Sequence, residues 1–449
     1  MFKAQTTLEQ AFTALDLDEV SAARWFAGKG GQAAAARLVD AVEIPGSQGA
    51  WLVLADVTHA DGGIGRYLLP TRIGTDGTFD EARPDDPLWL ALARVITTGA
   101  QLTGAVGSFT AAAGQLDATS PAGGRALTDD QSNTSIVLGE HLVVKCYRRP
   151  QEGTHPEPEL LAGLTRVDSK WAPAFGGSLV RHVPGDSETL ACVYAFVPGE
   201  PVGWERLIVR LRDLLAADDR AALDVLAVEM GALGAATAGL HVDLARAFGI
   251  ETASENEVHA AIDAANVQLD EALALATPDL AAILEHRAER ARGFLSELAR
   301  LTGSPVIRCH GDLHVGQFIA SSGGPIVVDF EGEPGRPVVE RRKPGSPLRD
   351  LACLLLSFDH AAAAAARRLS FGPALDAAFA WSAEARARAE SAYRDGVAGS
   401  GLGFDAQLLR ALEVEKECHE VIYAATVLPE WSYAPGLAIG RLLDGPSLA

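Results

Sequence analysis

One polar loop and the apolar run behind it constrain this 449-residue chain more than any other feature. The loop reads HGDLHVGQ over residues 310–317, and the apolar residues 326–328 lead directly into Asp329-Phe330-Glu331. This run predicts a short buried strand that ends at Asp329. Transfer of a nucleotide γ-phosphate needs a carboxylate that orients the attacking hydroxyl, and an amide and a second carboxylate that hold Mg²⁺ against the phosphates. Asp312, Gln317 and Asp329 supply this set, so the spacing favours phosphoryl transfer.

The same loop allows other interpretations. His310, Asp312 and His314 alternate as in hydrolases that bind a metal directly through imidazole and carboxylate groups. The carboxylate that ends the following strand favours the phosphotransferase interpretation. We expect His310 to brace the loop through hydrogen bonds, whereas His314 is equally consistent with a brace and with a substrate contact. Glu331 is a candidate additional metal ligand.

A second candidate site lies in residues 125–200. Lys145 ends the apolar run Leu142-Val143-Val144, and Glu159 begins a helical segment. A strand lysine paired with a helix glutamate is the pair with which kinases bind nucleotide phosphates. The alternative is two solvated surface charges, which contribute little to stability. The polar segment 131–135, with Ser132, is either a simple turn or a loop that covers the phosphates.

The net charge limits the possible binding partners, and the cysteine content indicates the cellular compartment. A net charge of −21 argues against nucleic acid and anionic membranes, which bind clustered Lys and Arg. The five cysteines are widely spaced and odd in number, as expected for reduced thiols in the cytoplasm. The sequence begins without a basic and apolar leader, and we expect no membrane-spanning segment. These features predict a cytoplasmic protein that acts on a small molecule.

The order of segments predicts an α+β fold. Residues 1–110 alternate short apolar runs with Gly and Asp turns and are interpreted as a β-containing N-terminal cap. A Gly, Ala, Ser and Thr-rich stretch over 104–124 suggests the boundary to a small β-rich lobe over 111–200. Helical periodicity dominates 201–449, with predicted helical segments at 205–247, 255–302, 360–398 and 404–426, apart from the segment 305–350. We therefore predict three parts: a cap, a small lobe and a helical C-lobe.

Several motifs together resemble the actinobacterial maltokinases and glucosamine kinases, which share the aminoglycoside-phosphotransferase, protein-kinase-like fold. The resemblance covers nearly the whole chain and rests on the loop and strand described above, on Lys145 with Glu159, and on the segments 24–29, 131–135, 203–205 and 346–350. It implies a bilobal fold that uses ATP and Mg²⁺. Asp312 would be the catalytic base, Gln317 and Asp329 the metal ligands, and Lys145 a phosphate contact, with adenine near Phe196 and Val197.

The acceptor is less well defined by the sequence. Leu313 and the segment 415–433 differ from the maltokinase pattern and reduce the aromatic surface that a disaccharide needs. Glu415, Glu420 and Trp431 would suit a cationic amino sugar, because an ammonium group gains charge-assisted hydrogen bonds from carboxylates. We therefore predict that glucosamine is converted to glucosamine 6-phosphate by a monomer or weak homo-oligomer. The alternatives are a maltokinase that forms maltose 1-phosphate, an aminoglycoside kinase and a non-catalytic nucleotide-binding regulator.

Overall fold

The computed structural model describes residues 8–26, 31–74, 77–119, 123–127, 132–276, 286–333 and 335–444. Its internal contacts define two units. Unit 1 comprises residues 1–165, 173–198 and 335–341, and unit 2 comprises residues 166–172, 199–334 and 342–449. Residues 27–29 of the segment 24–29, and Gln131, lie outside the described residues.

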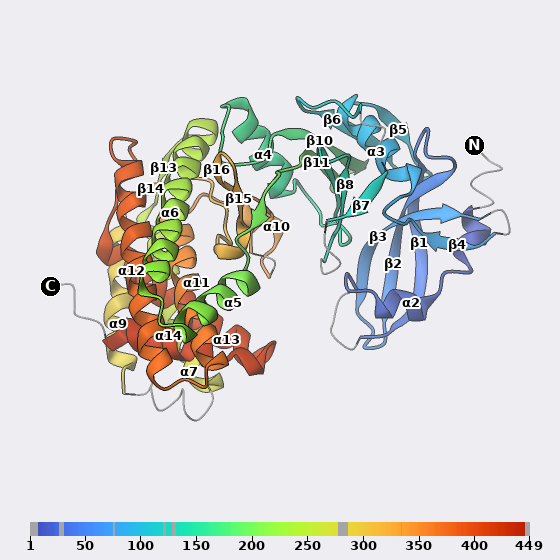
Figure 1. Cartoon of the computed structure of the whole chain (residues 1–449). Coiled ribbons are helices and arrows are strands. Elements are labelled where there is room, and N and C mark those ends of the chain that lie inside the picture. Colours follow the sequence, from blue (N-terminus) through green and yellow to red (C-terminus); the bar gives the residue numbers. More distant parts are fainter. Residues whose placement is uncertain are drawn as a thin grey trace. The chain divides into compact units, whose positions relative to one another are not determined.

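Unit 1 begins with a four-stranded antiparallel sheet in the order β1-β2-β3-β4 (Figure 1). Its strand β2 is buried on both faces, because Leu52 and Leu54 enter one apolar cluster whereas Val53 and Ala55 enter another. The second cluster also contains Trp25 and Phe26 from the segment 24–29. The elements of this part are α2 (Leu17–Ala22), β1 (Ala33–Glu43), β2 (Ala50–His59), β3 (Ile64–Ile73) and β4 (Phe79–Glu81).

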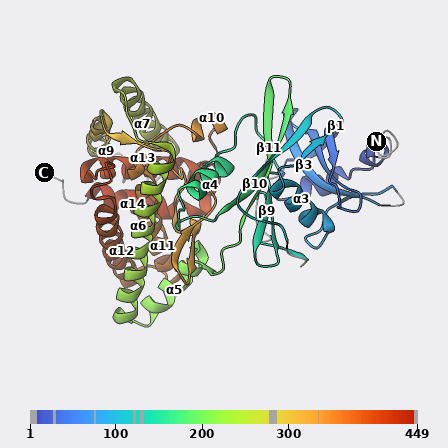
Figure 2. The ribbon, with the colours of Figure 1, turned by 90° about the horizontal axis from the view of Figure 1, so that it is seen from above.

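The remainder of unit 1 is a seven-stranded antiparallel sheet in the order β5-β6-β10-β11-β9-β8-β7, and helix α3 packs against its central strands (Figure 2). Strand β6 pairs with β10, so the boundary predicted at residue 110 falls within a strand of this sheet. The three-part division stays a prediction. The elements are α3 (Pro87–Thr97), β5 (Gln101–Thr103), β6 (Ser108–Ala113), β7 (Gly124–Ala126), β8 (Thr134–Leu138), β9 (Leu142–Cys146), α4 (Pro156–Arg166), β10 (Phe175–Val183), β11 (Asp186–Ala195) and α10 (Val338–Arg341).

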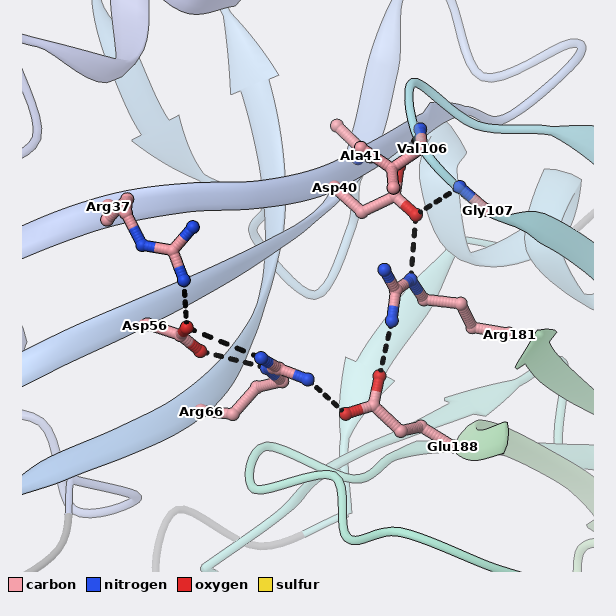
Figure 3. A network of polar contacts seen from close by, with 9 residues as sticks. All are labelled: Arg37, Asp40, Ala41, Asp56, Arg66, Val106, Gly107, Arg181 and Glu188. Carbon is pink, nitrogen blue, oxygen red and sulfur yellow. Dashed lines mark hydrogen bonds and ion pairs between the residues drawn. The ribbon is translucent and has the colours of Figure 1, made fainter. Parts of the chain in front are cut away.

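A chain of ion pairs joins the two sheets of unit 1 (Figure 3). Arg181 on β10 donates to Asp40 of β1 at 2.7 Å and to Glu188 of β11 at 2.9 Å. Glu188 also accepts from Arg66 of β3 at 2.7 Å, and Arg66 continues to Asp56 of β2. Arg181, Asp40 and Glu188 are each at least 97% buried. Buried charges need such partners, because isolated ions are strongly disfavoured away from water.

We expect Arg181→Met to lower the free energy of unfolding by about 3–5 kcal/mol, because Asp40 and Glu188 would stay buried after losing their shared cation. Urea unfolding measures this loss. The control is Arg37→Met, which removes a 72% exposed side chain from Asp56 and should cost less than about 1 kcal/mol. Equal losses of unfolding free energy in the two variants would contradict a special contribution of the buried ion pairs.

Unit 2 is mainly helical. Helix α11 is buried along most of its length and contacts α5, α12, α13 and α14, while α12 lies along α6 (Figure 1). Small strands form the sheets β12-β15-β16 and β13-β14. The helices are α5 (Trp204–Ala216), α6 (Arg220–Phe248), α7 (Glu255–Leu275), α9 (Ala288–Ser296), α11 (Pro347–Arg368), α12 (Pro373–Val397), α13 (Ala406–Thr426) and α14 (Tyr433–Asp444). The short elements are β12 (Glu200–Pro201), β13 (Glu251–Thr252), η1 (Glu297–Leu301), β14 (Pro305–Val306), η2 (Val315–Gln317), β15 (Phe318–Ser321), β16 (Gly324–Val327) and η3 (Pro429–Trp431).

Two helical segments were predicted as longer than they are. The segment 360–398 is divided between α11 and α12, because Ser370, Phe371 and Gly372 all have positive φ angles, which end a right-handed helix. The segment 205–247 is divided at Asp218, which also has a positive φ of 48°. Gly372-Pro373 at the first break and the N-cap residue Asp219 at the second are the sequence signals that could have located these turns.

Helix α6 is long and apolar enough to cross a membrane by length and composition alone. However, 61% of its most apolar 18-residue window is buried inside the structure, where α12 packs against it. Core helices pass the same test of length and composition, so this criterion is weak evidence for a membrane span.

Candidate active site

Backbone hydrogen bonds to one buried carboxylate hold the loop 310–317. Asp350, in the first turn of α11, accepts from the backbone N–H groups of His310 at 2.8 Å and Gly311 at 2.9 Å. His241 of α6 lies 3.1 Å from the same carboxylate and 2.9 Å from the Tyr393 hydroxyl. Burial alone raises the pKa of Asp350, but the hydrogen bonds and charges of its partners outweigh burial and lower that pKa. Asp350 is therefore suited to stay ionised as the anchor of the loop.

The contacts of His310 agree with a bracing role. Its Nδ1 accepts from the Asp312 backbone N–H at 3.3 Å, so its other nitrogen carries the proton and donates to the Val328 carbonyl at 3.0 Å. Both ring nitrogens are thus used within the protein, which argues against a metal bound by His310, Asp312 and His314. Through this bond the loop is also connected to Val328, the residue that follows β16.

Asp312 is half-buried and electrostatically coupled to α13. Burial raises the pKa of the Asp312 carboxyl to about 6, and the charge of Lys416 opposes this rise whereas Glu333 and Glu420 add to it. A carboxyl with a pKa nearer neutrality than usual is a better proton acceptor at physiological pH. The environment therefore suits the role of general base that the sequence predicts for Asp312.

His314, Gln317 and Asp329 lie together beyond this loop. His314 Nδ1 accepts from the Gly316 backbone N–H at 3.0 Å, and burial lowers the pKa of His314 to about 4, so the neutral ring carries its proton on Nε2. That nitrogen lies 3.4 Å from Gln317 Nε2, which donates to Asp329 Oδ2 at 3.5 Å. A turn of the Gln317 amide would replace this donation by an oxygen that accepts from the His314 Nε2–H, because the two ends of an amide are assigned from the hydrogen-bond network.

This orientation would place an amide oxygen beside the Asp329 carboxylate. Two such oxygens repel each other unless a cation lies between them, and oxygen atoms are the ligands that Mg²⁺ prefers. A carboxylate oxygen of Glu331 lies within 4.8 Å of one of Asp329. Asp329 has a positive φ of 67°, a conformation that costs about 1 kcal/mol or more for a residue with a side chain. The residues present therefore fit a divalent metal, as the sequence predicts for Gln317, Asp329 and Glu331.

A face of α13 brings further charges to the site. Lys416 lies 3.0 Å from Glu420, one helical turn away, and 3.4 Å from Glu333, which also lies 3.1 Å from His419. Burial lowers the pKa of Lys416, but the surrounding carboxylates outweigh burial and raise it. Sequence reasoning singled out Glu420 and missed Lys416, whose only signal was its position in a run of charged residues.

Glu415 has a different environment from Glu420. Both of its carboxylate oxygens accept from the guanidinium of Arg349, at 2.6 and 2.8 Å. Such a bidentate pair is stronger than a single charged hydrogen bond and fixes both side chains. We therefore assign Glu415 to positioning Arg349 rather than to the substrate contact that the sequence analysis expected.

Four rings from separate elements form a cluster that we call the aromatic wall: Trp204, His314, His360 and Trp431. The ring centroid of Trp204 lies 5.5 Å from that of His314, 6.3 Å from that of His360 and 6.3 Å from that of Trp431. Of the sugar-site residues predicted from the sequence, His314 and Trp431 lie in this wall. Trp204 and His360 were not predicted as site residues, although Trp204 lies in the segment 203–205 that carried the family resemblance.

In unit 1, Lys145 is buried at the end of β9 and lies 3.0 Å from Glu157. Glu157 is itself buried and also accepts from the Tyr147 hydroxyl at 2.7 Å. Lys145 is therefore paired with a glutamate of α4, and we assign Glu157 to this pair, whereas the sequence prediction was Glu159. The prediction counted from the apolar run 160–164, whereas α4 begins earlier, at Pro156.

Other residues predicted for the nucleotide lie on the same sheet. Phe196 follows β11 and donates its backbone N–H to His141 at 2.8 Å, and Val197 is buried beside it. Ser132 is exposed and precedes Asn133 and Thr134, whose side chains accept from Arg148 at 3.0 and 2.6 Å. Arg148 thus holds Asn133 and Thr134 in place at the start of β8.

Comparisons with known proteins identify the family and the fold of this chain. The model of the phosphotransferase enzyme family matches residues 123–394. The chain belongs to this family. A glucosamine kinase of Mycolicibacterium smegmatis is 33% identical over 72% of this chain and 80% of that protein. One of Streptacidiphilus jiangxiensis is 33% identical over 72% of this chain and 74% of its own.

A solved structure of similar fold is that of a glucosamine kinase in complex with glucosamine, ADP and inorganic phosphate. It has a TM-score of 0.73 and 26% identity, and the match covers 96% of this chain and 100% of that chain. The predicted family resemblance and α+β fold, with N-terminal sheets and a helical C-terminal region, are therefore confirmed. The prediction of a phosphate-transferring enzyme is also confirmed. The roles of individual site residues stay predictions.

Replacing Asp312 should affect activity and stability in opposite directions. We expect Asp312→Asn to reduce turnover by about 10²–10⁴-fold, the usual contribution of a general base. Because the folded-state pKa of about 6 exceeds the ordinary 3.8, the ionised carboxylate destabilises the fold above pH 6, and this penalty disappears as the pH falls toward 4. Asp312→Asn should thus raise the free energy of unfolding by about 1–3 kcal/mol at pH 8 and leave it unchanged at pH 4.

The two effects are measured by a coupled kinase assay and by urea unfolding at both pH values. Asp263→Asn, at an exposed position of α7, is the control and should change neither quantity. Full activity of Asp312→Asn would remove this residue from the role of base, and equal stabilisation at both pH values would contradict the raised pKa.

The assignment of Glu157 is tested by comparing two matched variants in the first turn of α4. Glu157→Gln should raise the KM for ATP, the predicted cofactor, by about tenfold or more, because Lys145 loses its buried ion pair. Glu159→Gln should change that KM by less than about twofold, because its half-buried side chain lies on another face of the helix. Initial-rate measurements at varied ATP decide the matter, and the reverse ranking would restore Glu159 as the pair's glutamate.

Proposed function

We propose that this protein transfers the γ-phosphate of ATP to the 6-hydroxyl group of glucosamine with the help of Mg²⁺. The observation that carries the proposal is the half-buried Asp312, with its raised pKa, within the electrostatic reach of Glu333, Glu420 and Lys416. Support also comes from the two relatives named as glucosamine kinases and from the solved relative that holds glucosamine and ADP.

In the proposed reaction, Asp312 accepts the proton of the sugar hydroxyl. The hydroxyl oxygen forms a bond to the γ-phosphorus as the bond from that phosphorus to the β-γ bridging oxygen breaks, and ADP leaves with the bridging oxygen. Asp350 and His310 keep the Asp312 loop in place, so that the carboxylate needs no rearrangement when the acceptor arrives. When bound, Mg²⁺ would be held by Gln317 and Asp329, with Glu331 as a further ligand, and would offset negative charge on the phosphates.

The proposed acceptor contacts come from α13 and the aromatic wall. Glu420 is half-buried and shares Lys416 with Glu333, so one cation faces two carboxylates. An ammonium group would be attracted to this excess of negative charge. The faces of Trp204 and Trp431 offer apolar contact to a sugar ring. His314 is a half-buried member of the wall and is a further candidate contact.

We further propose that the protein acts in the cytoplasm as a monomer or weak homo-oligomer. All five cysteines are free thiols in the structure, and four of them are buried. Burial raises the pKa of the Cys146 and Cys353 thiols to about 12, which keeps them protonated and unreactive. Free, unreactive thiols agree with a reducing compartment.

The proposal is tested by a coupled assay with ATP and Mg²⁺ across glucosamine, glucose, N-acetylglucosamine, maltose and an aminoglycoside. We expect selective turnover of glucosamine, with the phosphate on the 6-oxygen as identified by NMR of the product. Glu420→Gln should raise the KM for glucosamine by about tenfold, because a charge-assisted hydrogen bond becomes a neutral one. The matched control is Glu384→Gln on α12, which alters an exposed ion pair.

Other outcomes would assign another function. Preferred turnover of maltose, with a 1-phosphate product, would favour the maltokinase alternative. Binding of ATP without turnover of any acceptor would favour the regulator. An unchanged KM for glucosamine in Glu420→Gln would remove this residue from the acceptor site even if glucosamine is the substrate.

A further inference from the structure

His360 and Glu417 form a buried pair behind the proposed acceptor site. His360 lies on α11 and is 5% exposed, and Glu417 lies on α13 and is fully buried. His360 Nε2 is 2.7 Å from Glu417 Oε1. The phosphoryl transfer described above does not use either residue, so the pair requires a separate explanation.

If the pair had only a structural role, it would lower the stability of the fold rather than raise it. The second carboxylate oxygen, Glu417 Oε2, is buried without a hydrogen-bond partner in the structure. Burial raises the pKa of Glu417 to about 7, and the attraction of Glu417 raises the pKa of His360 even though burial opposes it. A buried acid that lacks part of its hydrogen bonding destabilises a fold, and apolar residues of similar size often do better at such positions.

What the pair determines is the position of the His360 ring. This ring lies nearly parallel to Trp204, with centroids 6.3 Å apart and planes at 22°. It meets Trp431 edge to face, at 6.4 Å and 84°. Trp204 begins α5 and Trp431 ends η3, so a single imidazole contacts two tryptophans from distant parts of the sequence.

The hydrogen bond to Glu417 fixes the orientation of the His360 ring relative to the two tryptophans. Imidazole rotates easily about its side-chain bonds, whereas a short hydrogen bond to a buried carboxylate fixes the plane of the ring. Glu417 lies on the same helix as Lys416 and Glu420, which carry the charges of the proposed acceptor site. The aromatic and the charged parts of that site are thus connected through one hydrogen bond between α11 and α13.

We infer that His360, oriented by Glu417, is a positioning residue that sets the arrangement of Trp204 and Trp431 and thereby the affinity for the sugar acceptor. The inference rests on the proposed function, because it takes these tryptophans as the wall of the acceptor site. The inference predicts that loss of the pair changes the affinity for the sugar acceptor and not that for ATP. The residues proposed to contact ATP, Phe196 at the adenine and Lys145 at the phosphates, belong to unit 1.

The test compares Glu417→Leu with Glu417→Gln. The leucine removes the hydrogen bond to His360, and we expect the KM for glucosamine to rise by about tenfold or more with the KM for ATP within about twofold of the original. The glutamine retains an oxygen that accepts from a neutral His360, so the KM for glucosamine should return close to the original value. A purely structural role would not separate the two KM values.

Two further variants keep the test decisive. If Glu417→Leu does not fold, the double variant His360→Leu with Glu417→Leu removes both polar groups together and should show the same rise in KM. Ser382→Ala is the matched control, because it removes a 2.6 Å hydrogen bond to Asp359, the neighbour of His360 on α11, on the side facing α12. We expect lower stability and unchanged KM values for this control.

The results that would overturn the inference are specific. An unchanged acceptor KM in the leucine variants, or an equal rise of both KM values, would reduce the pair to a packing contact. The measurement uses whichever sugar the unsubstituted protein phosphorylates, so a different acceptor would contradict the glucosamine proposal and leave this test valid. If no sugar is phosphorylated, both the proposed function and the inference are wrong.

Discussion

The carboxylate of Asp350 is the interaction on which the catalytic arrangement depends. It accepts two backbone N–H groups of the loop and is itself held by His241, which is held by Tyr393. These contacts connect α11, α6 and α12 to one short loop. Because the carboxylate is buried and bonded on both oxygens, the loop has few alternative positions of similar energy. Asp312 directly follows the anchored residues His310 and Gly311, so the fixed backbone of the loop determines where its carboxyl lies.

Helix α11 extends this support to the rest of the site. Asp350 binds the start of the loop, Ser357 accepts from the Val315 backbone N–H at 3.2 Å, and His360 reaches the aromatic wall. Asp350 and Ser357 are seven residues apart, two helical turns, and therefore lie on the same face. Arg349 adds the bond to Glu415 and thereby to α13. The alanine-rich half of α11 packs closely against its neighbours, which keeps these contacts in register.

The sequence predicted what local spacing determines. The residues 310–317 and Asp329 lie in one loop and at the end of one short strand, so their chemistry could be inferred from their order. Strand β9 was located by its apolar run 142–144. Glu157 was missed in favour of Glu159 because two glutamates two residues apart differ only in the helix face on which they lie. Arg349 and Glu415 are 66 residues apart, and their pairing follows from how α11 and α13 pack, which the order of residues does not reveal.

The preference for a cationic acceptor depends on the balance of charges rather than on one residue. Glu415, which the sequence favoured, is neutralised by Arg349. Lys416 has Glu333 and Glu420 as ion-pair partners and also acts on Asp312, so three carboxylates share one ammonium group. His419 adds a positive charge beside Glu333 only when it is protonated. A protonated amino sugar would reduce the remaining negative charge, whereas a neutral disaccharide would leave it unchanged. The carboxylates of Glu333 and Glu420 also add to the raised pKa of Asp312. The preference for a cationic acceptor and the ability of Asp312 to accept a proton therefore depend on the same group of residues.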